Sequence, residues 1–142
     1  MTFGQGRLAP VCGSVLVVCV LTLAVSPARS AGFQEPGADG AAELAAEGQV
    51  VFGTSCVSCH DADGGQGAAP ALSGHPSMGA RDHIVRQILR GNAEKGMPAF
   101  AATLSDHQIA AVATYIRNAW ENAHGPVTEA DVKKVRAEAK AD

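Results

Sequence analysis

Two cysteines and a histidine, Cys56, Cys59 and His60, stand between a helical segment and a long irregular one. Before this motif, apolar residues recur at helical intervals, which predicts a helix over residues 41–55. Residues 56–79 are rich in Gly, Pro, Ser and Asp and show no strand alternation. An irregular stretch of this length is unusual in a compact domain unless it has a function. The chain must therefore place two thiols and an imidazole at a helix end, beside a loop that can wrap around a cofactor.

The three side chains of this motif can act on one object. Thiols three positions apart can face the same side of a helix end, and the adjacent histidine can reach a metal there. The pattern Cys-x-x-Cys-His is the attachment sequence of a c-type haem. In such a site Cys56 and Cys59 each form a thioether with a haem vinyl group, and the His60 imidazole binds the iron. The motif therefore predicts one covalently attached haem c.

Three other chemistries use the same residues. A thioredoxin-like dithiol needs a strand before Cys56 and a βαβ context, whereas a helix is predicted there. A structural zinc site needs four ligands, and no second Cys-x-x-Cys completes the three that Cys56, Cys59 and His60 supply. A disulfide is compatible with an oxidising compartment, although it gives His60 no role. The motif alone leaves the dithiol and the disulfide open.

A sixth ligand to the iron distinguishes an electron carrier from a haem with an open site. Met97 lies in a Gly-Met-Pro turn between two predicted helices, where glycine permits close approach and proline fixes the loop. Met78 is expected to fill the core, as most single methionines do. His75 is an alternative that gives two histidine ligands and a lower potential. The spacing from His60 and the Gly-Met-Pro setting favour Met97 as the sixth ligand, and His/Met ligation is typical of electron carriers because a thioether raises the reduction potential.

The rest of the chain predicts further helices and no strands. Residues 81–90 have one apolar side and are followed by a glycine that can end the helix. Ser105 with Gln108 forms a capping-box pattern, and the helix that it starts is expected to end before Gly125. Residues 128–141 are mostly charged and predict a short, weakly packed helix. The predicted class is all-α.

These motifs, in this order, resemble the class I monohaem cytochromes c. The resemblance covers roughly residues 42–123, and its matching positions are Gly48, Phe52, Cys56-Val57-Ser58-Cys59-His60, Gly67, Pro70, Leu72, Gly96-Met97-Pro98-Ala99-Phe100, Leu104-Ser105 and Tyr115-Ile116. It implies a cytochrome c fold with three main helices around one covalently attached haem, plus a short C-terminal helix. It places Gly48 and Phe52 where the first and last main helices cross. It also implies that the Pro70 carbonyl accepts a hydrogen bond from His60, which orients the imidazole.

The same resemblance implies a one-electron carrier and not an enzyme. With His60 and Met97 both bound to the iron, no position stays open for a substrate. The expected partners are redox proteins such as a dehydrogenase, a reductase or a terminal oxidase. The alternative is a haem-bearing electron-transfer subunit of a larger dehydrogenase or reductase complex, because residues 115–136 resemble the tails of cytochromes that accompany such enzymes. A haem enzyme or gas sensor would require that Met97 does not bind the iron.

The first 30 residues have the features of an export signal. Arg7 precedes an apolar run over residues 11–25, and small residues follow within residues 28–30. The alternative is an uncleaved membrane anchor at the lower limit of length for a span, and only this alternative attaches the protein to a membrane. The predicted organisation is a signal peptide at 1–30, a flexible linker at 31–40, a cytochrome c domain at 41–124 and a C-terminal extension at 125–142, with the mature protein in the periplasm.

Removal of that signal changes the cysteine count and the charge. Cys56 and Cys59 become the only cysteines. Taking Arg7 and Arg29 from the 11 basic residues leaves 9 against 14 acidic ones, a net charge of −5 with neutral histidines. Such a chain has no general affinity for nucleic acid, and its partner is expected to carry a basic or mixed surface.

Positive charge gathers ahead of the methionine turn, at Arg81, Arg86, Arg90 and Lys95. One interpretation is a docking patch beside the haem edge, or a partner for a haem propionate. The solvated face of a helix is the more common reason for such a cluster.

Overall fold

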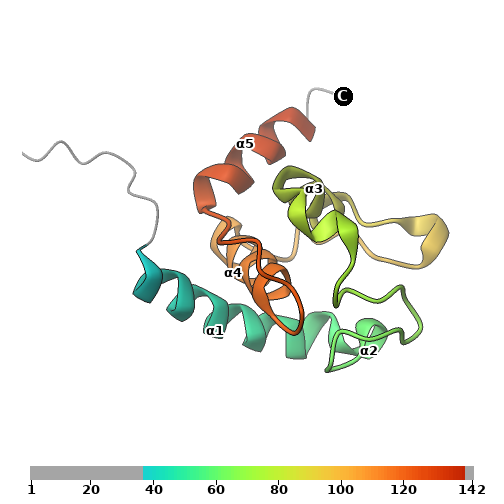
Figure 1. The fold of residues 1–142 in the computed structure, drawn as a ribbon. Helices are drawn as coiled ribbons and strands as arrows, with labels where there is room; N and C mark the ends of the chain where they lie inside the picture. Colours follow the sequence, from blue (N-terminus) through green and yellow to red (C-terminus); the bar gives the residue numbers. More distant parts are fainter. Residues whose placement is uncertain (1–36, 140–142) are drawn as a thin grey trace, which may run out of the picture. The chain divides into compact units, whose positions relative to one another are not determined.

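The computed structural model describes residues 37–139, and the regular elements in this part of the chain are helical (Figure 1). Their order is α1 (Ala38–Ser55), α2 (Val57–His60), η1 (Pro76–Gly79), α3 (Arg81–Arg90), η2 (Ala93–Lys95), α4 (Asp106–Asn118) and α5 (Glu129–Ala139), where η marks a 3₁₀ helix. The predicted all-α class is confirmed. No helix among the described residues has the length and hydrophobicity of a membrane span. The predicted signal peptide, residues 1–30, lies outside the described residues.

The first helix begins earlier than the sequence predicts. α1 starts at Ala38, so residues 38–40 of the predicted linker are helical. Ala41 N donates to Gly37 O at 2.9 Å, which closes the first turn, and Asp39 places a carboxylate near the positive end of the helix dipole. The high helix propensity of the alanines in this segment outweighs the glycine among them.

α1 and α4 cross at Gly48, and this crossing brings two helix backbones together (Figure 1). A Cβ on Gly48 would lie 2.0 Å from Ala111 O and 2.8 Å from Tyr115 Cβ. One turn further along α1, Phe52 is only 3% exposed, and its ring centroid lies 5.5 Å from that of Tyr115. The helix crossing that the family resemblance implies is therefore present, and it depends on the lack of a side chain at Gly48.

Replacing Gly48 by Ala is expected to lower the free energy of unfolding by roughly 1–3 kcal/mol, the usual cost of overpacking. The new methyl group meets the backbone of α4, which cannot rotate away as a side chain can. Gly53→Ala in the same helix is the matched control, because a Cβ there has nothing within 4 Å. That change should stabilise the protein by up to about 1 kcal/mol through helix propensity. Urea unfolding of the haem-loaded protein measures both, and a stabilised Gly48→Ala variant contradicts the close crossing.

The capping box predicted at Ser105 is confirmed. Ser105 Oγ accepts a hydrogen bond from Gln108 N at 3.1 Å, and Gln108 Oε1 accepts one from Ser105 N at 2.9 Å. The helix ends at Asn118, and the chain turns at Trp120, whose φ of 56° is rare for a bulky residue. The Trp120 indole Nε1 donates to Ala62 O at 3.2 Å, so this turn is tied to the loop that follows α2.

α5 packs firmly against α3 and α4, and the prediction of a weakly packed helix is wrong (Figure 1). Val127, Val132 and Val135 have no exposed surface. Thr128 begins the helix as a cap, because its Oγ1 accepts a hydrogen bond from Asp131 N at 3.2 Å. The charged composition suggested a solvated helix, but two valines three positions apart are enough to give this helix a buried side. The C-terminal segment belongs to the same compact unit as the rest of the described chain.

The arginines of α3 make contacts with α5. Arg81 Nη1 lies 3.2 Å from each carboxylate oxygen of Asp131, and Arg86 Nη2 lies 3.0 Å from Glu138 Oε2. Arg90 Nη2 donates to a carbonyl of α5 at 3.5 Å. These side chains join two helices of one domain, so the interpretation of this cluster as a docking patch is not supported.

His107 connects three helices through two carboxylates. Its Nε2 lies 2.6 Å from Glu47 Oε2 on α1, and its Nδ1 lies 3.1 Å from Glu129 Oε1 on α5. The hydrogen bonds to Glu47 and then to Glu129 raise the pKa of His107 above its usual value of 6.5. The contact among these helices is therefore strongest when His107 is protonated.

The contribution of His107 to stability is expected to depend on pH. A group whose pKa is raised by folding stabilises the protein below its unfolded pKa, and this stabilisation is lost as the pH rises through the folded pKa. His107→Gln should therefore lower stability at about pH 5.5 more than at about pH 8.5, by up to about 1 kcal/mol because the pairs are half exposed. Thermal unfolding at both pH values measures the difference, which should shrink in a Glu47→Gln background. A difference that does not change with pH contradicts the assignment.

Candidate haem-binding site

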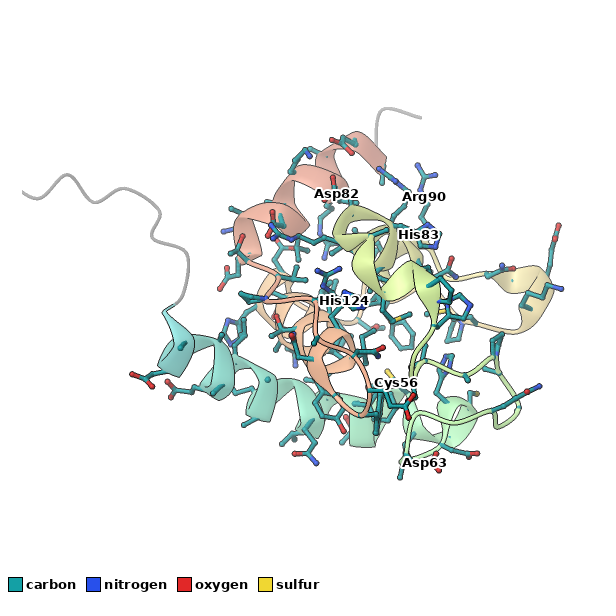
Figure 2. The ribbon with its side chains drawn as sticks, viewed as in Figure 1. Cys56, Asp63, Asp82, His83, Arg90 and His124 are labelled. Atoms are coloured by element: carbon teal, nitrogen blue, oxygen red, sulfur yellow. The ribbon has the colours of Figure 1, made fainter. Side chains whose placement is uncertain are left out.

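A cavity of about 400 Å³ lies among α3, α4 and the loop that follows α2. The predicted site residues Cys56, His60, Pro70 and Met97 line it, whereas Cys59 does not. Figure 2 shows Cys56 just beyond the end of α1 and His83 on α3, and both residues line the cavity. The apolar part of the wall comes from Phe52, Ala69, Ala71, Leu72, Met78, Ile84, Ile88, Val112 and Ile116. A cavity of this size and composition is typical of a cofactor site.

The two thiols lie at the turn α2, with Cys56 directly before it and Cys59 within it. Cys59 N donates to Cys56 O at 3.1 Å, so one turn of backbone separates them. Cys56 is partly buried and Cys59 is exposed. Burial, with a smaller contribution from Cys59, raises the pKa of the Cys56 thiol to about 11. A dithiol redox catalyst needs a thiolate near neutral pH, so the surroundings of Cys56 do not suit that alternative.

The zinc alternative lacks a ligand set in the part of the chain that the structure describes. Among residues 37–139, no three His, Cys, Asp or Glu side chains are close enough to hold a metal ion. Cys56, Cys59 and His60 therefore gain no fourth partner from the folded loops.

The two histidines in the cavity wall differ in which ring nitrogen can bind a metal. His60 Nδ1 lies 3.1 Å from Pro70 O. A carbonyl only accepts, so Nδ1 must carry the proton and Nε2 keeps its lone pair. His75 Nδ1 instead accepts a hydrogen bond from Ser77 N at 3.2 Å, which leaves the proton of the neutral ring on Nε2. His60 is thus prepared to bind iron through Nε2, and His75 is not.

The loop that carries Pro70 is held against α2. Ala69 N donates to Cys59 O at 3.0 Å, and a Cβ on Gly67 would lie 2.7 Å from the same oxygen. Glycine is therefore required at this approach. The contact fixes the Pro70 carbonyl beside the imidazole and makes the orientation of His60 a property of the loop.

Met97 enters the cavity from a closed turn. Asn92 N donates to Met97 O and Met97 N donates to Asn92 O, both at 2.9 Å. Inside this turn Gly96 has a φ of 78°, and nothing lies within 4 Å of a Cβ built on it. Glycine is therefore needed at position 96 for the left-handed backbone conformation, and not because a neighbouring group leaves no room for a side chain. Gly91 provides the close approach, since a Cβ there would lie 2.5 Å from Met97 O and Pro98 O.

The Met97 sulfur has a hydrogen-bond donor that the sequence did not reveal. Gln87 Nε2 on α3 lies 3.4 Å from Met97 Sδ. A glutamine within an amphipathic helix gives no signal of this contact, because the contact depends on how the methionine turn folds back on α3. Gln87 is part-buried, so little water competes for the sulfur.

Gln87→Leu is expected to lower the reduction potential of the haem. A donor to the sulfur withdraws electron density from the thioether, which weakens its donation to ferric iron more than to ferrous iron. The expected change in the one-electron equilibrium is roughly threefold to tenfold, which corresponds to about 30–60 mV. Potentiometric titration measures this change in potential. Gln87→Glu is a second variant, which keeps the shape of the side chain and removes the amide donor. An unchanged potential in Gln87→Leu contradicts the role of this hydrogen bond.

Met78 also lines the cavity, but its surroundings are those of a core residue. It is only 3% exposed and belongs to the main hydrophobic cluster. Its carbonyl accepts a hydrogen bond from Arg117 at 2.6 Å, which fixes the backbone of η1. The expectation that Met78 fills the core agrees with this packing.

The donor set around the cavity fits a haem c. The wall is largely apolar, and Lys95 is the one Lys, Arg, Asp or Glu among the described residues that line it. A thiol from the residue between α1 and α2, an imidazole with an available Nε2 from α2 and a thioether from the methionine turn all line the cavity. Such a set can hold an iron porphyrin covalently and fill both of its axial positions.

Comparison with known families agrees with this chemistry. The family model described as "Cytochrome C oxidase, cbb3-type, subunit III" matches residues 43–116, more than half of the chain. The chain is a class I monohaem cytochrome c. Members of this group carry haem c, so the cytochrome binds covalent haem c. The predicted family and cofactor are confirmed.

The relatives include proteins named simply as cytochromes and proteins named as cytochrome subunits of enzymes. Cytochrome c-552 of Thermus thermophilus is 31% identical over 119 residues, which cover 69% of this chain and 80% of that protein. Cytochrome c6 of Leptolyngbya boryana is 39% identical over 77 residues, 51% of this chain and 88% of that protein. The gluconate 2-dehydrogenase cytochrome c subunit of Pantoea cypripedii is 36% identical over 107 residues, 63% of this chain. The matched part is only 24% of that subunit's length.

Proposed function

We propose that this cytochrome is an exported one-electron carrier in which Cys56 and Cys59 hold the haem and His60 and Met97 bind its iron. One observation carries the proposal. His60 and Met97 come from separate segments, yet both line the same apolar cavity. An imidazole and a thioether in the wall of one cavity are the ligand pair of an electron carrier, and this pair leaves no open position for a substrate.

The residues of the cavity have distinct tasks. When bound, the haem supplies a reversible one-electron iron couple. The hydrogen bond from His60 to Pro70 O fixes the ring and strengthens it as a ligand. The Met97 thioether favours the reduced iron and so raises the potential. The apolar wall excludes water, which favours the state with less charge.

The features of residues 1–30 support export to the periplasm. The proposed partners there are a dehydrogenase, a reductase or a terminal oxidase, bound briefly through a small interface as is usual for redox encounters. The alternative, a subunit of a larger complex, is supported by relatives named as cytochrome subunits of gluconate, alcohol and fructose dehydrogenases. The chain spans about a quarter of the length of each of these relatives.

Potentiometric titration of the protein purified with its haem tests the proposed function. We expect a single reversible one-electron transition, with a far-red sulfur-to-iron band in the oxidised form. An irreversible transition, or the absence of that band, contradicts a His/Met-ligated carrier. Purification from its own cells before and after a salt wash distinguishes the two forms of the proposal. A carrier elutes alone after the wash, and a subunit stays with a larger catalytic chain.

A further inference from the structure

Arg117 carries the one buried charge in residues 37–139. It is only 2% exposed, and no other Lys, Arg, Asp or Glu of the described chain is buried. Its guanidinium donates to Met78 O at 2.6 Å, to His124 O at 2.5 Å and to Gly125 O at 3.4 Å. Backbone carbonyls satisfy these donors, but they carry no charge of their own. The net positive charge of the side chain therefore stays within the protein.

This charge lies behind the wall of the haem cavity. Met78, whose carbonyl accepts a hydrogen bond from Arg117, lines the cavity. Ile116, which directly precedes Arg117 in α4, lines it as well. The charged groups that act on Arg117 are Arg81 and Asp131, which form an ion pair at 3.2 Å. Because this pair is neutral as a unit, one positive charge remains, separated from the cavity by about one layer of residues.

We propose that Arg117 raises the reduction potential of the haem in this cavity. The inference rests on the proposed function, because it concerns the same haem. Oxidised haem carries one more positive charge than reduced haem, so a nearby fixed cation disfavours oxidation. Water and salt screen such an effect at the surface, and burial preserves it. At an effective dielectric constant near 20 and a separation on the order of 10 Å, the one-electron equilibrium changes roughly tenfold. This change corresponds to about 59 mV.

Arg117 also holds the chain together, so its electrostatic effect must be separated from its hydrogen bonds. Asn122 ties the same region independently. Its Nδ2 donates to Leu72 O at 3.0 Å and to Ile116 O at 2.8 Å, and its Oδ1 accepts from Gly74 N at 3.0 Å. The loop that forms this side of the cavity therefore keeps several anchors when Arg117 is changed. Neutral variants at this position are expected to fold with reduced stability.

The test compares two substitutions that separate charge from hydrogen bonding. Arg117→Gln removes the charge and keeps a donor, whereas Arg117→Lys keeps the charge and loses the fork of donors. Potentiometric titration of the full-length, haem-loaded protein should give a potential about 59 mV lower for Arg117→Gln, the tenfold change above. Arg117→Lys should stay close to wild type. Thermal unfolding measures stability, which should follow the number of hydrogen bonds that each variant keeps. The order of the two variants in stability is therefore not expected to follow their order in reduction potential.

Two further variants complete the design. Arg86→Gln removes a partly exposed cation that is paired with Glu138, and it should leave the potential nearly unchanged because water screens that charge. Asp131→Asn removes the negative charge that pairs with Arg81 near Arg117, so it should raise the reduction potential. This variant still tests the sign of the charge effect if Arg117→Gln does not take up haem. An unchanged potential in Arg117→Gln, an equal fall in Arg117→Lys, or a lower potential in Asp131→Asn overturns the inference. Failure of the proposed function is seen separately, as the lack of a reversible couple in the wild type.

Discussion

A protein with both Cys56→Ser and Cys59→Ser is expected to lose its covalent haem completely. Serine hydroxyls do not add to haem vinyl groups under the conditions in which thiols do, so no thioether can form. The haem stain of a denaturing gel should fall to background, while the wild-type band keeps its stain. The site therefore depends on these thiols for retention of the cofactor as well as for its placement.

Single variants should separate the contributions of the two thiols. Cys56 lies in the cavity wall and Cys59 is exposed, so we expect Cys56→Ser to reduce haem retention more than Cys59→Ser. Ser58→Ala, between the two cysteines, is the matched control and should keep the full stain. Stain that persists in the double variant after denaturation contradicts the attachment.

The parts of this molecule that the sequence predicts well are those fixed by local rules. α3 begins and ends at the predicted residues because an apolar stripe and a following glycine define it. The capping box at Ser105 is equally local, since both partners lie within four residues. The Cys-x-x-Cys-His motif belongs to the same class, because its spacing alone places the thiols one turn apart.

The features that could not be predicted depend on tertiary contacts between distant segments. Gln87 reaches the Met97 sulfur only because the methionine turn folds back on α3. An arginine near a helix end is normally expected in solvent, yet Arg117 is buried by the segment that leads to α5. The packing of α5 depends on Val132 and Val135, which are too few to stand out in a charged segment.

These two groups of features meet in the haem cavity. Its covalent and axial positions follow from motifs that can be read along the chain. Its electrostatic surroundings follow from Gln87 and Arg117, which no motif marks. We therefore infer that the sequence specifies the cofactor, whereas the tertiary fold adjusts the potential at which the cofactor exchanges electrons.

Met97→Ala is expected to change the electronic properties of the haem more than any other single substitution outside the attachment motif. Loss of the thioether removes the ligand that favours ferrous iron, so the potential should fall by about 120 mV or more, a hundredfold change in the equilibrium. The far-red sulfur-to-iron band of the oxidised protein should disappear. Both readouts are needed, because the potential alone also responds to changes in solvent access.

Met78→Leu is the matched control, since it replaces the other methionine of the cavity with a residue of similar volume. Its far-red band should persist, and its potential should stay near that of the wild type.

Two results would overturn the assignment of Met97. If Met78→Leu removes the band and Met97→Ala keeps it, Met78 is the ligand. If the wild type lacks the band, no methionine binds the iron, and the sixth position is either taken by His75 or open as in a haem enzyme or a gas sensor. His75 is not expected to take over in Met97→Ala, because its Nδ1 accepts from Ser77 N and the proton on Nε2 blocks coordination. A double variant with His75→Gln should therefore have the same spectrum as Met97→Ala alone.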